Sequence, residues 1–248
     1  MKKSLFIPLL MVCATGFAQN GDSTRSSGLG GLLKKASSVL NSGKSTGSLT
    51  SDEIVAGLKE ALTQGANKTG TKLSTVDGFF KDAAIKILMP DDVRKVETKL
   101  RALGMGKIFD QAVESMNRAA EDASKSAAPI FVSAIKQMRV QDAVDILKGT
   151  DTAATYFLRK STSNDLTHAF LPVVQNSLKK VNATKYWGQV FTLYNKVSST
   201  PVNTDINEYV TQRAMNGIFY YVGEEEKKIR TNPAERVTAL LKKVFGSQ

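Results

Sequence analysis

The chain has 248 residues, 42% of them hydrophobic, which is enough for one sizeable core without requiring two independent domains. Its formal net charge of +11 suits anionic lipid, acidic glycan or nucleic acid, and charge alone does not choose among them. Aromatic residues make up only 7% and do not alternate with basic residues along a strand, so we expect no nucleic-acid partner. A single cysteine excludes an intramolecular disulfide.

Residues 1–18 have the pattern of a cleavable signal peptide. Two lysines precede an apolar run, and Gly16-Phe17-Ala18 offers small residues where signal peptidase cuts, which would leave Gln19 first. The apolar run is shorter than the roughly 20 residues that span a membrane, so we expect no transmembrane helix. The protein is therefore expected to be exported, either to the periplasm or to the medium.

Cys13 leaves a second interpretation of this leader open. Leu10-Met11-Val12-Cys13 is similar to a lipoprotein signal, in which the cysteine becomes a lipidated N-terminus, although Val12 is bulky for that peptidase. With ordinary cleavage the mature chain has no thiol, which also excludes thiolate catalysis and cysteine metal sites.

Residues 19–48 are expected to form a flexible tether, because fourteen of these thirty positions are Gly or Ser. Within the tether, apolar residues recur at helical spacing across 29–40, with Lys34 and Lys35 on the other side. This pattern is typical of a short basic amphipathic helix. It predicts either contact with an anionic envelope surface or a frayed helix that docks on the main domain or stays mobile.

From residue 49 to residue 248 the pattern predicts a single all-α domain, a compact bundle of about nine or ten helices. Thr50-Ser51-Asp52-Glu53 is a capping box that begins the first helix, and Gly65 and Gly70 are expected to end it. Asp151 and Asp205 are expected to cap later helices. The later helical segments are 91–103, 106–123, 129–138, 141–148, 151–157, 162–178, 183–197, 205–231 and a last one after Pro233, and a short apolar piece at 83–89 ends at Pro90.

Four strings in this domain occur in a recognisable order and spacing. They are IVAGLKEAL at 54–62, MNRAAE at 116–121, AIKQM at 134–138, and GIFYY at 217–221 followed by EE at 225–226 and IRTNP at 229–233. Together they resemble the bacterial domain-of-unknown-function family 4197, from about residue 50 to the C-terminus. The resemblance implies an exported helical protein with no established activity, catalytic residue or cofactor. Members often have an acidic residue where this chain has Asn216, so any role of that acid is in doubt here.

Several polar residues fall on helix faces that are otherwise apolar. Arg213 and Glu225 share the apolar face of the 205–231 helix, and Asn117 and Glu121 lie one turn apart beside the apolar stripe of the 106–123 helix. A buried charge costs several kcal/mol unless it is paired. Each of these residues should therefore have a partner or line a water-filled cavity.

Three interpretations of these residues stay open. They could line one pocket, where Arg and Lys hold an anionic head group beside apolar walls; they could form a polar network that fixes helix register; or Glu121 and Glu225 could serve a hydrolase or lyase as acid and base. We expect a non-enzymatic protein that binds a small apolar or anionic ligand or an envelope partner. The predicted site residues are Asn117, Arg118, Glu121, Lys136, Arg213, Glu225 and Arg230.

His168 is the only histidine, and its potential catalytic partners Ser163 and Asp165 are neighbours in sequence alone. We therefore expect an ordinary surface or half-buried histidine. With one histidine and no mature cysteine, we expect neither a metal site nor a cofactor.

Overall fold

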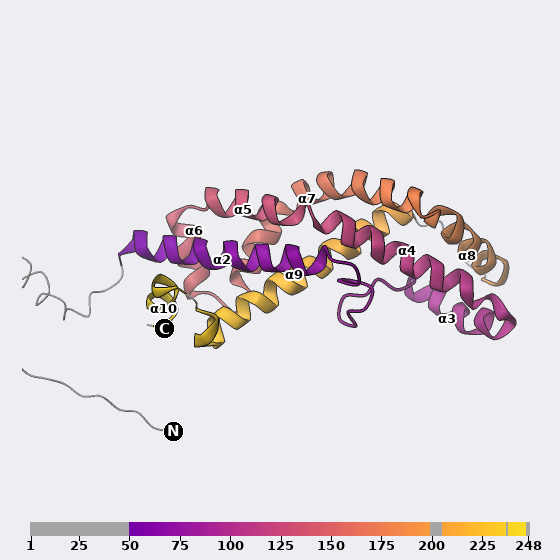
Figure 1. Cartoon of the computed structure of the whole chain (residues 1–248), viewed down its shortest axis with the longest axis horizontal. Coiled ribbons are helices and arrows are strands. Elements are labelled where there is room, and N and C mark those ends of the chain that lie inside the picture. The colour runs from indigo at the N-terminus through magenta and orange to yellow at the C-terminus, as the bar shows by residue number, and fades with distance from the viewer. Residues whose placement is uncertain (1–49, 199–204, 237, 247–248) are drawn as a thin grey trace, which may run out of the picture. The chain divides into compact units, whose positions relative to one another are not determined.

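The computed structural model of the protein describes residues 50–198, 205–236 and 238–246, and within these ranges the chain forms helices and irregular segments but no strand (Figure 1). The predicted all-α class is confirmed. The predicted signal peptide at 1–18, the tether at 19–48 and its segment at 29–40 lie outside the described residues. The α-helices are α2 (Ser51–Leu73), α3 (Asp91–Leu100), α4 (Gly106–Ser124), α5 (Ala127–Gln137), α6 (Val140–Lys148), α7 (Ala153–Lys180), α8 (Ala183–Val197), α9 (Ile206–Thr231) and α10 (Ala239–Gly246). Residues Arg101–Met105 join α3 to α4 through a kink at Gly104, whose φ is 82°, and a 3-10 turn, Pro233–Glu235, follows α9.

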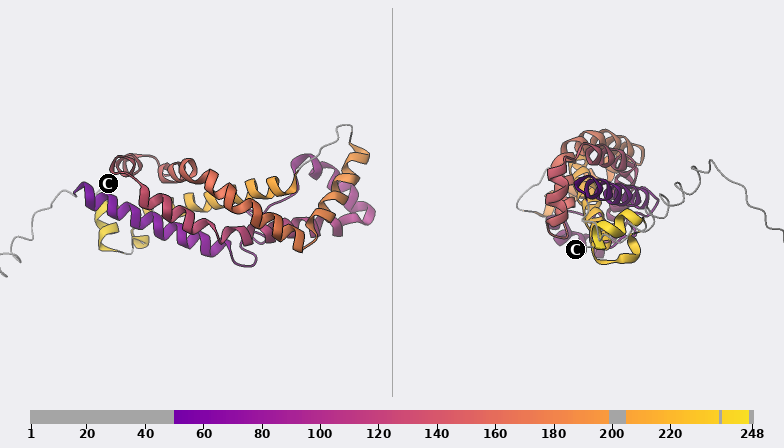
Figure 2. Two further views of the ribbon diagram at one scale, coloured as in Figure 1. Left: turned by 90° about the horizontal axis from the view of Figure 1, so that it is seen from above. Right: turned by 90° about the vertical axis from the view of Figure 1, so that its left-hand side faces the viewer.

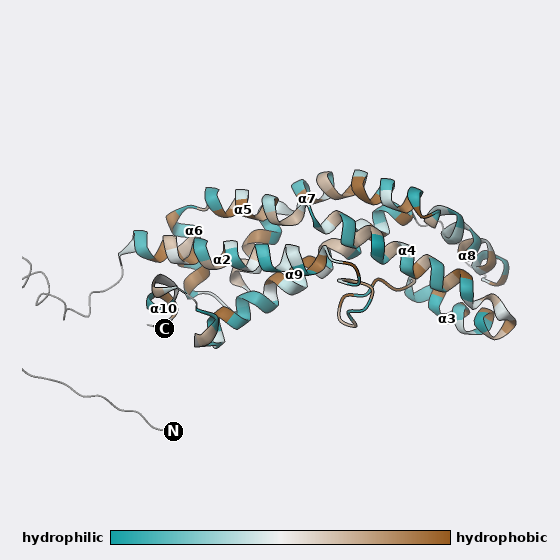
Figure 3. Ribbon diagram, in the orientation of Figure 1, coloured by the Kyte–Doolittle hydropathy of each residue, from teal (hydrophilic) through white to brown (hydrophobic). Residues whose placement is uncertain are grey.

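The helices from α2 to α10 pack around α9 and α7. α9 lies against α2, α4 and α7, while α7 also contacts α5 and α8 (Figures 1 and 2). Apolar and polar residues alternate along the helices, so each buries one face and leaves another to solvent (Figure 3). Phe131 of α5 and Phe219 of α9 meet edge to face in the core, with ring centroids 5.6 Å apart.

The first helix, α2, continues past the two glycines that were predicted to end it. The capping box is confirmed, because the Glu53 amide donates to the Thr50 hydroxyl and the Glu53 carboxylate accepts from the Thr50 amide. Gly70 is buried, and a Cβ there would lie 2.9 Å from the Cβ of Ala128 on α5. This glycine allows the close approach of two helices, and tertiary packing outweighs its poor helix propensity.

Two predicted helices do not exist as separate elements. Residues 151–157 and 162–178 belong to the single helix α7, whose N-cap is Thr152, so the cap predicted at Asp151 is wrong. Thr162 lies inside this helix, where its buried hydroxyl donates to the Leu158 carbonyl at 2.6 Å. The segment 83–89 forms no α-helix. The predicted series of about nine or ten helices therefore needs correction where two of them merge into α7.

Residues 74–90 connect α2 to α3 without an α-helix, and we call them the 74–90 segment. The segment is not a surface loop, because the side chains of Phe79, Ile87 and Met89 are almost completely buried. Gly217 of α9 leaves room for one of these side chains, since a Cβ at this position would lie 2.6 Å from Cε1 of Phe79.

We expect Gly217→Ala to lower the free energy of unfolding by about 1–3 kcal/mol, because the added methyl group clashes with the buried Phe79 ring. The matched control is Gly188→Ala in α8, where a Cβ would have no neighbour within 4 Å. There the alanine should stabilise the protein by about 0.5–1 kcal/mol through helix propensity. Urea unfolding of both variants measures the difference, and effects of the same sign would contradict the packing described for Gly217.

Candidate functional site

Asn117 of α4 satisfies the backbone of the 74–90 segment at residue 87. Its Oδ1 accepts from the Ile87 amide at 2.8 Å, and its Nδ2 donates to the Ile87 carbonyl at 2.8 Å. Nδ2 also donates to the Val113 carbonyl of its own helix at 2.7 Å. The side chain is fully buried, and its single amide group pairs both the backbone amide and the backbone carbonyl of Ile87, which lies in no helix or strand.

Glu121, one turn further along α4, holds the same segment at residues 79 and 80. Its Oε1 accepts from the backbone amides of Phe79 and Phe80, both at 3.1 Å, and its Oε2 accepts from Arg118 Nη1 at 2.9 Å. The carboxylate is 5% exposed. It is a buried charge, but one paired with a guanidinium and two amides, as a buried carboxylate requires.

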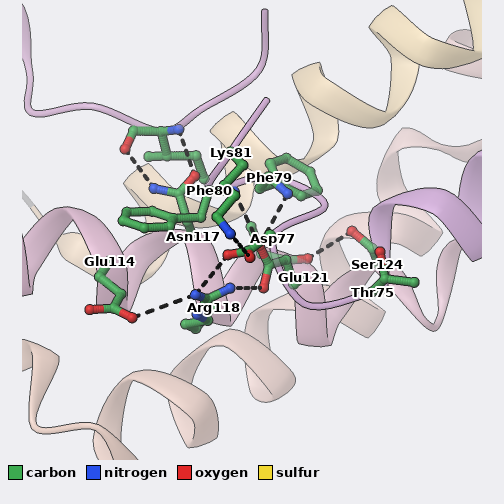
Figure 4. A network of polar contacts seen from close by, with 12 residues as sticks. Thr75, Asp77, Phe79, Phe80, Lys81, Glu114, Asn117, Arg118, Glu121 and Ser124 are labelled. Carbon is green, nitrogen blue, oxygen red and sulfur yellow. Dashed lines mark hydrogen bonds and ion pairs between the residues drawn. The ribbon is translucent and has the colours of Figure 1, made fainter. Parts of the chain in front are cut away.

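Arg118 links Glu121 to the start of the segment. Its Nη2 lies 2.9 Å from Asp77 Oδ1 and 3.5 Å from Glu114 Oε1, and its guanidinium stands over the Phe80 ring (Figure 4). Burial acts to lower the pKa of Arg118, but the hydrogen bonds to Glu121 and Asp77 outweigh it and raise the pKa. Hydrogen bonds from Lys81 and Arg118 lower the pKa of Asp77.

The structure thus brings three predicted site residues together, Asn117, Arg118 and Glu121, which we call the α4 clamp (Figure 4). Their polar atoms point at the backbone of the 74–90 segment and at each other. This arrangement favours the interpretation as a polar network that fixes the position of neighbouring elements.

Helix α9 holds the same segment through two tyrosines. The Tyr209 hydroxyl donates to the Leu88 carbonyl at 2.7 Å, and the Tyr221 hydroxyl donates to the Asp82 carboxylate. Burial raises the pKa of Tyr209, which keeps the hydroxyl proton available for its bond. The 74–90 segment is therefore fixed from two helices, α4 and α9.

Glu225 is buried as predicted, but it lies in a different set of contacts. It is 7% exposed and pairs with Lys68 of α2 at 2.9 Å and with Lys228 at 2.7 Å. Burial acts to raise its pKa, but the hydrogen bonds from the two lysines outweigh this and lower it. Glu225 therefore joins α2 to α9 as an ion pair rather than joining the α4 clamp.

Arg230 belongs to a third set of contacts, with a partner that is not among the predicted site residues. Glu226 is only 5% exposed, and its two oxygens accept from the amides of Ala154 and Thr155 in the first turn of α7. Arg230 lies 2.9 Å from Glu226 and donates to the Ile146 carbonyl near the end of α6 at 2.8 Å. One ion pair of α9 therefore caps two other helices with charges that suit their dipoles.

The spacing of Glu226 and Arg230 is the one sequence signal that could have found this pair. They are four residues apart, a separation at which opposite charges meet on a helix. Sequence could not show that both side chains face the junction of α6 and α7, because those helices lie about seventy to eighty residues away in the chain.

Lys136 and Arg213 do not lie where the sequence predicted. Lys136 has an exposed side chain on α5, and its backbone carbonyl accepts a hydrogen bond from Lys59 Nζ at 2.9 Å. Arg213 is exposed rather than turned to the core, because the 74–90 segment covers only part of this face of α9. Its guanidinium lies 5.3 Å from the centre of the Tyr209 ring.

Arg213 lines a pocket of about 350 Å³ between α9 and residues 84–91, which we call the α9 pocket. Asp91 at its edge is bonded to Arg94 at 3.1 Å. In the described parts of the chain, no carboxylate lies within 4.0 Å of the charged groups of Lys86 or Arg213. Its charged and aromatic lining residues are Lys86, Asp91, Arg94, Tyr209, Arg213 and Tyr220.

His168 and Asp165 line a wider, shallower pocket of about 700 Å³ between α5 and α7. Both side chains are exposed. Among the residues that the structure describes, no cluster of His, Cys, Asp and Glu side chains could hold a metal ion, and no helix is long and apolar enough to cross a membrane.

Comparison with known proteins gives one match. The profile of a family described as "Protein of unknown function (DUF4197)" matches residues 48–246, which covers all the residues that the structure describes. No curated protein and no solved structure matches the chain.

We expect Glu121→Gln to lower the free energy of unfolding by about 2–4 kcal/mol, because the neutral amide cannot accept from Arg118 and from two backbone amides together. The matched control, Glu114→Gln, removes an exposed partner of the same Arg118 and should cost no more than about 1 kcal/mol. Chemical denaturation at neutral pH measures both. Equal costs would show that the α4 clamp does not depend on the buried carboxylate.

We expect Arg230→Met to destabilise the protein by about 2–4 kcal/mol, because it leaves the buried Glu226 charge without its cation. Adding Glu226→Gln to this variant should recover part of the loss, since it removes the unpaired buried charge while the single oxygen of the neutral amide still accepts from one of the two α7 amides. A double-mutant cycle then gives a coupling free energy of about 1–3 kcal/mol. Strictly additive effects would mean that the two side chains act independently.

Proposed function

The chain belongs to the DUF4197 family of proteins of unknown function, and from the geometry of the α9 pocket we propose that it binds a small anionic ligand without catalysing a reaction. The observation that carries this proposal is that Lys86 and Arg213 line the pocket and neither forms an ion pair with a carboxylate of the described residues. The carboxylate of Asp91, which also lines the pocket, is paired with Arg94. A ligand carboxylate or phosphate would supply the missing countercharge.

The shape of the α9 pocket supports the same proposal. Its volume of about 350 Å³ falls within the range of small-molecule sites, which runs from roughly 300 to 1,000 Å³. The Tyr209 ring backs the Arg213 guanidinium, and the Tyr209 hydroxyl is fixed on Leu88. Both contacts restrict the wall that would orient an anion, which lowers the entropy cost of binding.

The competing hydrolase or lyase interpretation has less support. Glu121 and Glu225 contact different partners on different elements, and neither lines the α9 pocket. The oxygens of Glu121 are already occupied by two amides and Arg118. Two lysines lower the pKa of Glu225, which opposes the protonated form that a general acid needs.

The α4 clamp acts on the α9 pocket indirectly. Asn117 bonds to residue 87 of the 74–90 segment, and residues 84–91 form one wall of the pocket. We therefore assign the clamp a positioning role and place ligand contact on Lys86 and Arg213. The proposed place of action is outside the cytoplasm, which rests on the signal-peptide pattern of residues 1–18.

We expect Arg213→Gln to weaken the binding of benzoate and phenyl phosphate about tenfold or more, because it removes a charge-assisted hydrogen bond from the α9 pocket. The thermal midpoint should change little, since Arg213 is exposed. Isothermal titration of the intact protein measures the affinities.

The matched control is Lys99→Gln, which removes one exposed positive charge from α3 outside the α9 pocket. It should change the affinities less than twofold if binding is local rather than a response to net charge. Failure of both anions to bind the unmodified protein, or equal effects of the two substitutions, would overturn the proposed function.

A further inference from the structure

A second pocket lies against the first and shares part of its lining. It has a volume of about 330 Å³ and extends toward α3 and α4, and we call it the α3–α4 pocket. Lys86, Leu88, Met89 and Arg94 line both pockets. The two pockets therefore meet along the same short stretch of the 74–90 segment and the first turn of α3.

The two pockets differ in charge balance. In the α3–α4 pocket, Arg101 lies 2.7 Å from both Glu97 and Asp110, so its charge is already neutralised. Arg213 lines only the α9 pocket and has no carboxylate partner among the described residues, whereas Lys86 lines both pockets and its ammonium lies 4.2 Å from the centre of the Phe80 ring. An anionic group is therefore favoured in the α9 pocket, because the carboxylates of Glu97 and Asp110 line the α3–α4 pocket.

The α3–α4 pocket combines charged residues with an apolar part. Phe80, Met89 and Val113 contribute to its lining together with Leu88. The Leu88 side chain stands at the boundary of the two pockets and is 42% exposed, which is high for a large aliphatic residue next to a core. The aliphatic stems of Lys86 and Arg94 add apolar surface on either side of it.

We propose that the two pockets form one site for a single-chain amphiphile with an anionic head. The head binds Arg213 and Lys86 in the α9 pocket, and the chain passes over Leu88 into the α3–α4 pocket. This inference rests on the proposed function and names the class of its ligand. A ligand with a second anionic group is disfavoured, because Glu97 and Asp110 line the far pocket.

The test is a homologous series of ligands, hexanoate, octanoate, decanoate and laurate, titrated calorimetrically into the intact protein below their micelle concentrations. Affinity should rise about two- to fourfold with each added methylene until the α3–α4 pocket is filled, as expected for burial of an alkyl chain. Decyl glucoside, which has a neutral head, should bind at least about tenfold more weakly than decanoate.

Two substitutions separate the head from the chain. Arg213→Gln should weaken every member of the series by a similar factor, whereas Leu88→Ser should flatten the dependence on chain length and leave hexanoate almost unchanged. Leu103→Ser is the matched control, because Leu103 is a 71% exposed leucine that lines neither pocket. Circular dichroism of each variant confirms that it is folded.

The possible results distinguish this inference from the proposed function. Binding that depends on Arg213 but not on chain length would overturn the amphiphile inference and leave the anion site standing. Equal effects of Leu88→Ser and Leu103→Ser would mean non-specific adsorption and would also overturn it. Absence of binding by every anion tested, benzoate and phenyl phosphate included, would overturn both.

Discussion

The hydrogen bonds between α4 and the backbone of the 74–90 segment are the interaction on which the rest of this structure depends. The segment is partly buried and forms neither an α-helix nor a sheet, so turns within it and side chains of other elements must pair its amides and carbonyls. Each buried group left unpaired would cost about 1–3 kcal/mol. Asn117 and Glu121 supply four of these bonds from one face of one helix. The irregular segment can therefore remain in the core, where its side chains complete the packing of α4 against α9.

The same segment gives the protein its candidate site. Its inner side is bonded to the α4 clamp, and its outer side lines the α9 pocket and the α3–α4 pocket. Gly217 is also needed to hold the segment in place, because the Phe79 ring packs against α9 at the position where Gly217 has no side chain. The position of Lys86 is thus set by residues that need not touch a ligand. This separation of positioning from contact is common in binding sites built on rigid elements.

Interactions between neighbours in the sequence predicted much of the fold, whereas contacts between residues far apart in the sequence could not be predicted. The Thr50 capping box, the Asp205 cap and the extent of α9 follow from neighbours in the sequence, and the family suggested by four strings is confirmed. Gly70 failed as a helix end because its partner is Ala128 on another helix. Arg213 was placed on the wrong face, and Glu226 was not among the predicted site residues, because a helical pattern cannot show which other elements cover each side. The seven predicted site residues consequently divide among separate contact sets.

The capping of α7 by Glu226 has a consequence for which parts of the chain can change length. Thr152 makes no side-chain cap of its own, so residue 152 is free of that requirement, whereas Gly149 in the same turn is not, because a Cβ there would lie 2.6 Å from the Cβ of Ala153. α9 has no such freedom between Gly217 and Glu226. One residue inserted between them would rotate the rest of α9 by about 100°. Gly217 could then not face Phe79 while Glu226 also faced the first turn of α7. A separation of nine positions along one helix thereby fixes the spacing between two distant parts of the protein.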